Sequence, residues 1–256
     1  MHILIALLTI VLATSAGAFQ PVAGQKSVAE QEIGALLEAA ATDSVKKDIA
    51  KSFFNKYPDD IPGGRIAQDI LLKNLEDPIT FFKKRLEQQE TLANRYWYGR
   101  ASRDSVIMAE TAKLILNDYP DNYWGHELAG YAEWYRAKPD TGVLIREFRA
   151  AIKADPSRPE AYLYLGWVYW DEEQWPEMRE ALEAGAIADP TDKSIRDARL
   201  TVYAEQRDAD AFFTLMQGVF SDTPLTADLP RARGGANLTT AELRNQPTVI
   251  EYWAYT

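Results

Sequence analysis

The apolar positions downstream of residue 28 follow the spacing of amphipathic helices. Over 28–41, 45–57 and 65–75, apolar residues recur every three or four positions and so share one helical face. Short polar stretches separate these segments, and one of them contains Gly63 and Gly64, which we expect to form a turn. The pattern therefore predicts a row of short helices, with an N-terminal helical region at 19–77.

Prolines recur downstream at a nearly regular interval. Spacings of 42, 36, 34 and 34 residues separate Pro78, Pro120, Pro156, Pro190 and Pro224. Each interval has room for two helices, and the second should end at the proline, because proline cannot continue the helical hydrogen-bond ladder. A period of this length is typical of stacked helical repeats.

The unit at 159–190 carries a specific motif. It has the spacing W-x2-L-G-x2-Y, supplied by Tyr162, Leu165, Gly166 and Tyr169. This motif, closed by Pro190, resembles the tetratricopeptide repeat (TPR) family. The resemblance implies an all-α, TPR-like helical-repeat solenoid over 78–224. The preceding unit keeps Gly130 but has a longer turn at 138–142, and the unit after Pro190 has the character of an atypical end repeat.

Aromatic residues occupy equivalent places in two successive repeats, one and four positions after the glycine of each motif. They are Tyr131, Trp134, Trp167 and Trp170. The TPR resemblance implies that these positions face a concave groove, where large rings with a polar tip form a binding hot spot for a peptide or protein partner. The same spacing fits a second interpretation, in which the rings pack between adjacent repeats.

The composition changes after residue 224. Residues 225–236 have the Pro- and Gly-rich character of a linker. The β-branched and aromatic residues of 247–256 are typical of a strand, for which the preceding repeats offer no partner strands. This tail resembles the first strand of a thioredoxin-like domain, which a C-x-x-C motif would follow. The resemblance implies that 237–256 is the truncated start of such a domain.

Composition narrows the possible chemistry. The chain has no cysteine, which excludes disulfides, thiolate metal sites and thiol nucleophiles. A formal charge of −10 without a long basic run disfavours nucleic acid as a partner. His126 and Glu127 begin like a zinc-protease helix, but Gly130 stands where the second histidine is needed. We therefore expect no catalytic residues, no metal site and no cofactor in this chain.

The N-terminus has the features of a secretory signal peptide. Residues 3–12 form an almost unbroken apolar run, and the small residues at 16–18 match a cleavage site. We expect removal of 1–18 and a secreted or periplasmic mature protein. The apolar run is shorter than the roughly 20 residues of a membrane-spanning helix, and no later segment approaches that length, so membrane insertion is not expected.

Three functional hypotheses are compatible with these features. The first is an exported, non-catalytic scaffold that binds a peptide or protein through the aromatic groove. The second is the substrate-positioning part of an exported thioredoxin-like thiol-disulfide oxidoreductase, truncated before its C-x-x-C motif. That exchange reaction requires a thiolate, which this chain lacks. The third is a helical spacer without a ligand groove.

Overall fold

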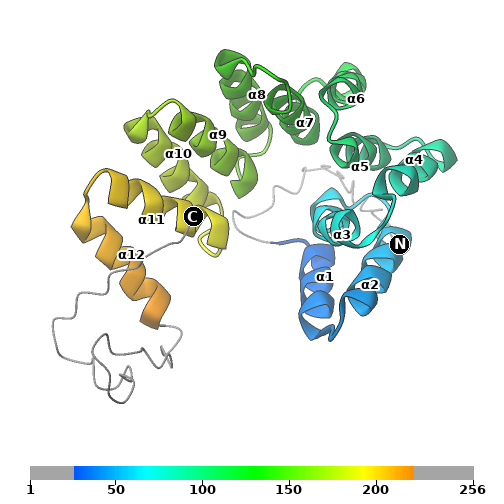
Figure 1. Cartoon of the computed structure of the whole chain (residues 1–256), viewed down its shortest axis with the longest axis horizontal. Coiled ribbons are helices and arrows are strands. Elements are labelled where there is room, and N and C mark those ends of the chain that lie inside the picture. Colours follow the sequence, from blue (N-terminus) through cyan, green and yellow to red (C-terminus); the bar gives the residue numbers. More distant parts are fainter. Residues whose placement is uncertain (1–25, 222–256) are drawn as a thin grey trace, which may run out of the picture.

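The structure is a curved row of short helices. The computed structural model describes residues 26–221, and within this range twelve α-helices follow one another and no strand occurs (Figure 1). The helices are α1 (Val28–Ala39), α2 (Asp43–Lys56), α3 (Ile61–Asn74), α4 (Pro78–Gln88), α5 (Leu92–Ser102), α6 (Ser105–Asp118), α7 (Tyr123–Trp134), α8 (Thr141–Ala154), α9 (Pro159–Asp171), α10 (Trp175–Ala188), α11 (Lys193–Glu205) and α12 (Ala209–Ser221). The prediction of an all-α helical-repeat solenoid is confirmed.

Odd-numbered and even-numbered helices occupy different sides of the curve. Consecutive helices pack against each other from α4 to α12. In addition, α1 contacts α3, α3 contacts α5, α5 contacts α7, and α9 contacts α11, whereas no two even-numbered helices make comparable contacts within 26–221. The odd-numbered helices therefore form the inner, concave side, and the even-numbered helices spread out on the convex side.

Short polar residues explain where the odd-numbered helices begin. Ser27 and Glu30 form a capping box at α1, in which each side chain accepts a hydrogen bond from the backbone N–H of the other residue. Asp60, Asn122 and Asp192 accept from backbone N–H groups in the first turns of α3, α7 and α11. The sequence thus gathers polar side chains at one end of the concave helices.

The prolines have two different roles. Pro120, Pro156 and Pro190 follow the ends of α6, α8 and α10, as the repeat period predicts. Pro78 instead begins α4, where Asp77 caps the helix by accepting from a backbone N–H at 3.0 Å. The prediction of two helices in each interval is therefore wrong for the interval from Pro78 to Pro120, which holds α4, α5 and α6. The fixed φ and missing N–H of proline also suit the first helical position, so Pro78 adds a helix to this interval.

The prediction of a turn at Gly63 and Gly64 is also wrong. Both glycines lie buried in the first turn of α3. A Cβ atom on Gly63 would lie 2.6 Å from Phe53 Cζ, and one on Gly64 would lie 2.5 Å from Trp97 Cζ2. Glycine is needed at both positions because α3 packs closely on α2 and α5. The contacting residues lie elsewhere in the sequence, so the local Pro-Gly-Gly pattern does not reveal this role.

The hydrophobic core runs across residue 77 without a break. Phe54 of α2, Phe82 of α4 and Trp97 of α5 are fully buried. The ring centroid of Phe54 lies 5.4 Å from that of Phe82 and 4.7 Å from that of Trp97. A second cluster of buried residues continues from α8 to α11. The boundary between an N-terminal helical region (19–77) and TPR-like repeats (78–224) was predicted from the repeat motif, and it stays a prediction.

Glycines set the close crossing of the later helix pairs. A Cβ atom on Gly130 would lie 2.5 Å from Phe148 of α8, and one on Gly166 would lie 3.0 Å from Leu182 of α10. Both glycines therefore face the partner helix of their own pair. This is the role that the TPR resemblance implies for them.

Several predictions concern residues outside the described range. The signal peptide at 1–18, the linker at 225–236 and the thioredoxin-like segment at 237–256 all lie there. Between residues 26 and 221, the length and hydropathy of every helix fall short of what a membrane span requires.

Candidate binding site on the concave side

A cavity of about 990 Å³ lies where the starts of the odd-numbered helices meet. Its lining includes residues at or just before the starts of α1, α3, α5, α7, α9 and α11. The N-caps among them are Ser27, Asp60, Asn122, Arg158 and Asp192. Ser27 Oγ also donates a hydrogen bond of 3.1 Å to Asp60 Oδ2, which joins the starts of α1 and α3. The site is therefore assembled from segments that are far apart in the sequence.

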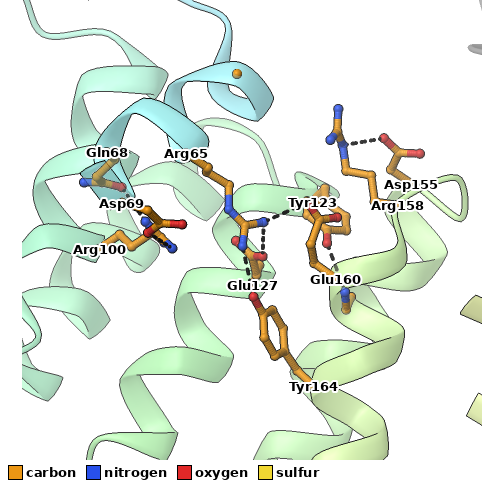
Figure 2. A network of polar contacts seen from close by, with 12 residues as sticks. Arg65, Gln68, Asp69, Arg100, Tyr123, Glu127, Asp155, Arg158, Glu160 and Tyr164 are labelled. Atoms are coloured by element: carbon orange, nitrogen blue, oxygen red, sulfur yellow. Dashed lines mark hydrogen bonds and ion pairs between the residues drawn. The ribbon is translucent and has the colours of Figure 1, made fainter. Parts of the chain in front are cut away.

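Arg65 lies at the inner wall of this cavity, with its side chain largely buried. Its Nη1 atom lies 2.7 Å from Glu127 Oε1 in α7 and 3.2 Å from Glu160 Oε1 in α9. Its Nη2 atom donates a hydrogen bond of 2.9 Å to the hydroxyl of Tyr164. Figure 2 shows the guanidinium reaching from α3 between these groups. A single side chain thus ties α3 to α7 and α9.

Glu127 is fully buried and receives a second contact from α5. The hydroxyl of Tyr96 donates a hydrogen bond of 2.5 Å to Glu127 Oε2. Burial raises the pKa of the Glu127 carboxyl, and the charge of Arg65 opposes that shift. Burial acts to lower the pKa of Arg65, but Glu127 and the surrounding tyrosines outweigh it and hold that pKa well above its ordinary value. Arg65 therefore keeps its positive charge.

A second group of polar contacts lies beside Arg65 (Figure 2). Arg100 Nη1 donates to Gln68 Oε1 at 3.0 Å, and Arg100 Nη2 lies 2.9 Å from Asp69 Oδ1. Gln68 Nε2 in turn donates to the backbone carbonyl of Trp97 at 2.7 Å. These contacts fix α3 against α5 next to the cavity.

The lining of the cavity is acidic. Seven carboxylate side chains and three basic side chains contribute to it. In the described part of the chain, only Asp69 and Glu160 among the seven lie in ion pairs, with Arg100 and Arg65. Glu160 Oε2 is buried and has no hydrogen-bond partner among the described residues. A surplus of negative charge therefore faces the cavity.

Trp124, at the start of α7, is contacted by two arginines of the cavity. The guanidinium carbon of Arg158 lies 4.6 Å from a ring centroid of Trp124, and that of Arg65 lies 5.6 Å away. Arg158 also pairs with Asp155, at 3.1 Å between Nε and Oδ2. Cation–π contacts of this geometry help to hold both guanidinium groups in place.

The four aromatic residues predicted to form a binding surface are all partly buried. Tyr131 packs on Tyr164 of α9 with ring centroids 5.0 Å apart, and burial raises the pKa of its hydroxyl. Trp134 packs on Phe148 of α8 with ring centroids 6.0 Å apart. Both rings therefore pack between helices and keep part of their surface accessible.

Trp167 and Trp170 belong to a separate aromatic cluster. Their ring centroids lie 5.8 Å apart, and Trp170 lies 5.5 Å from Trp175 at the start of α10. The structure thus brings Trp167 and Trp170 together, while Tyr131 and Trp134 pair with other rings. The use of all four residues as one binding surface stays a prediction.

Sequence reasoning missed the charged residues of this site. Arg65, Glu127 and Glu160 each follow or precede apolar residues in a helix, which is a weak signal of burial. His126 and Glu127, adjacent in the sequence, have unrelated partners. His126 Nδ1 lies 2.9 Å from Glu147 Oε2, whereas Glu127 pairs with Arg65.

Comparisons with known proteins bear on the fold alone. No family model and no curated protein matches the sequence. The chain is similar to the solved structure of TTC0263, a thermophilic TPR protein of Thermus thermophilus, at 14% identity and a TM-score of 0.50, over 72% of this chain and 93% of that one. It also aligns with a MamA RS-1 ArsTM double mutant at 15% identity and a TM-score of 0.47, over 72% of this chain and 98% of that one.

These comparisons give no support to a thioredoxin-like start at 237–256. The described part of the chain has the fold of a TPR-like helical-repeat solenoid.

Proposed function

We propose that this chain is a non-catalytic scaffold that binds an extended segment of a partner protein on its concave side. The observation that carries the proposal is the cavity of about 990 Å³ at which the starts of six helices meet. Cavities of this size are large enough for specific ligands. The curvature of helical-repeat proteins creates extended concave surfaces that suit binding.

Partly exposed tryptophans extend the proposed contact surface beyond the cavity. Trp134, Trp167 and Trp170 keep accessible surface although each packs against neighbouring rings. Rigid rings of this kind give a large contact area with a small loss of conformational entropy on binding. Tyr131 supports this surface indirectly, because its contact with Tyr164 holds α7 and α9 together.

The proposal assigns no reaction to this chain. Thiol-disulfide exchange needs an attacking thiolate, and the sequence contains no cysteine. Purified protein should therefore not accelerate the reduction of insulin by dithiothreitol beyond a heat-denatured control. Acceleration by the folded protein would contradict the non-catalytic assignment.

We also propose a secreted or periplasmic location, which rests on the apolar run and small-residue pattern within 1–18. Fusion of these residues to a reporter enzyme that is active only after export tests this point. The fusion should be active, and the same reporter without residues 1–18 should be inactive. An inactive fusion that accumulates in the cytoplasm would contradict export.

Selection from a random peptide library, followed by fluorescence anisotropy, tests the binding proposal. Peptides that bind the wild-type protein should bind a Trp134→Ala/Trp170→Ala variant more weakly by roughly 1–4 kcal/mol, the range of aromatic hot spots. Tyr119→Ala is the matched control, because Tyr119 is 53% exposed, caps the C-terminus of the even-numbered helix α6 and does not line the cavity. It should change the affinity by less than about twofold.

A urea melt of each variant separates binding from folding. Truncation of a fully buried tryptophan destabilises a protein by about 3–5 kcal/mol, and partly exposed rings should lose clearly less. A failure to select any peptide, or equal losses of affinity in the double variant and in Tyr119→Ala, would contradict the proposed function.

A further inference from the structure

We infer that residues 247–256 pack on an exposed apolar face of α12 and so cover the last helix of the row. This contact lies outside the concave cavity and does not depend on the proposed function. Two features of the molecule lead to it. The helix α12 lacks a neighbour that the preceding even-numbered helices have, and an apolar segment follows α12 in the sequence.

The even-numbered helices α6, α8 and α10 each pack against the helix before and the helix after them. The contact with the following helix is close. The ring centroid of Phe148 in α8 lies 5.5 Å from that of Tyr164 in α9. A Cβ atom on Gly185 of α10 would lie 2.7 Å from Ile195 Cδ1 in α11. Each of these helices therefore has two covered faces.

The helix α12 has one covered face. It lies at the end of the row (Figure 1), and in the described part of the chain only α11 makes comparable contacts with it. Phe212 packs on the buried cluster that runs from α8 to α11. Ala209, Phe213 and Met216 have the spacing of a second helical face, and Phe213 is 62% exposed. This second face is the side on which a following helix would pack.

The second face of α12 is apolar. Asp210 is the only charged residue of 209–216, and none of these eight residues is buried. The ring of Phe213 meets Phe212 edge-on, with centroids 5.6 Å apart, and leaves the rest of its surface exposed. Terminal repeats of a soluble solenoid need a polar outer face. An apolar face at this place therefore indicates an interaction surface.

Residues 247–256 match this face in chemistry. They include Val249, Ile250 and Trp253, and Glu251 is their only charged residue. The residues between α12 and this segment, 222–246, contain six charged residues and no aromatic one. The free energy gained by burial grows with the apolar area that leaves water. Of the chain that follows α12, residues 247–256 therefore gain most from covering Phe213.

The chain between the two partners is long enough for this contact. Residues 222–246 span at most about 80 Å when fully extended, whereas the 13 residues of α12 form a helix about 20 Å long. Because the segment belongs to the same chain, its effective concentration at α12 is on the order of millimolar. A contact too weak to hold a separate molecule therefore suffices within one chain.

Photo-cross-linking in the full-length mature protein tests the contact. A p-benzoylphenylalanine replaces Phe213 in one variant and Val106 of α6, which is also 62% exposed, in the control. An equal mixture of isotope-labelled and unlabelled protein is irradiated, and mass spectrometry identifies the joined peptides. We expect position 213 to be joined to residues 247–256 that carry the same label. Position 106 should not be joined to them.

Hydrogen exchange measures the same contact without altering α12. Trp253→Asp places a charge in the apolar segment and should speed the amide exchange of residues 209–216 at least about tenfold, because α12 loses its cover. Asn245→Asp adds the same charge just before the segment and should leave these rates unchanged. The exchange of α1 should be equal in both variants and the wild type, which verifies that the repeats remain folded.

The outcomes separate this contact from its alternatives. Cross-links between differently labelled chains would show that a second copy covers α12, and they would overturn the inference. The inference is also overturned if position 213 is not joined to 247–256, or if position 106 is joined to them equally. Unchanged exchange of α12 in Trp253→Asp has the same consequence. None of these results bears on binding at the concave side.

Discussion

Arg65 of α3 and Glu127 of α7 form a buried ion pair, with 2.7 Å between Nη1 and Oε1, although 62 residues separate them in the sequence. In a simple solenoid, each repeat contacts only its neighbours. This pair passes over α5, and the contact of Arg65 with Tyr164 extends the connection to α9, 99 residues away. The curvature of the concave side is therefore fixed by a polar cluster as well as by packing between neighbouring helices.

The first prediction concerns this ion pair. Arg65→Met should destabilise the protein by about 3–5 kcal/mol, because it leaves the carboxylate of Glu127 buried without its cation. An Arg65→Met/Glu127→Gln double variant should recover most of the loss, since the fully buried carboxylate is then neutral. Urea unfolding at neutral pH measures both. A double variant that is less stable than Arg65→Met would contradict this account of the pair.

The second prediction concerns two helical glycines with opposite surroundings. Gly64→Ala should destabilise the protein by about 1–3 kcal/mol, because its Cβ atom would lie 2.5 Å from the fully buried Trp97. Gly34→Ala in α1 should stabilise it by about 0.5–1 kcal/mol, because no atom lies within 4 Å and alanine favours the helix. Thermal unfolding by circular dichroism compares them. A Gly64→Ala variant that is as stable as the wild type, or more stable, would refute the close packing at Gly64.

The third prediction concerns pH. The hydrogen bond to Glu147 raises the pKa of His126, with a smaller contribution from the carbonyl of Pro120, and burial opposes this. Protonated His126 therefore stabilises the folded protein. This contribution is complete below the pKa of the histidine in the unfolded chain, about 6.5, and is lost as pH rises through its higher pKa in the folded protein. The same hydrogen bond lowers the pKa of Glu147, so its contribution is lost only as pH falls through a value below the ordinary carboxyl range.

Urea melts at about pH 6 and pH 8.5 measure this effect. The wild type should be less stable at the higher pH, and His126→Gln should remove most of the difference. The assignment is clear because His2 is the only other histidine of the sequence. An unchanged pH dependence in His126→Gln would show that other groups cause it.

The helices were predictable from the sequence because their signals are local. Apolar periodicity, the caps and the prolines at the ends of α6, α8 and α10 all act within one or two turns. Gly64 shows where this reasoning fails. A Pro-Gly-Gly stretch is a turn signal, but the deciding contact is with Trp97, which lies 33 residues further along the chain.

The candidate site was less predictable than the helices. The aromatic positions could be located from the repeat, but their partners Tyr164, Phe148 and Trp175 depend on how the helices pack. The acidic cavity has no sequence motif, because residues at six separate helix starts build it. A contact between residues as far apart in the sequence as Arg65 and Glu127 produces no periodic pattern that a single sequence could reveal.

Photo-cross-linking of a bound peptide tests the central claim, that the concave side is the binding surface, most directly. A photo-reactive p-benzoylphenylalanine replaces Trp167 in one variant and Tyr119 in another; Tyr119 is exposed, caps the C-terminus of α6 and does not line the cavity. After irradiation with a peptide selected on the wild type, mass spectrometry identifies the joined residues. We predict a cross-link from position 167 and none from position 119. Cross-links from position 119 alone, or equally from both, would contradict binding on the concave side.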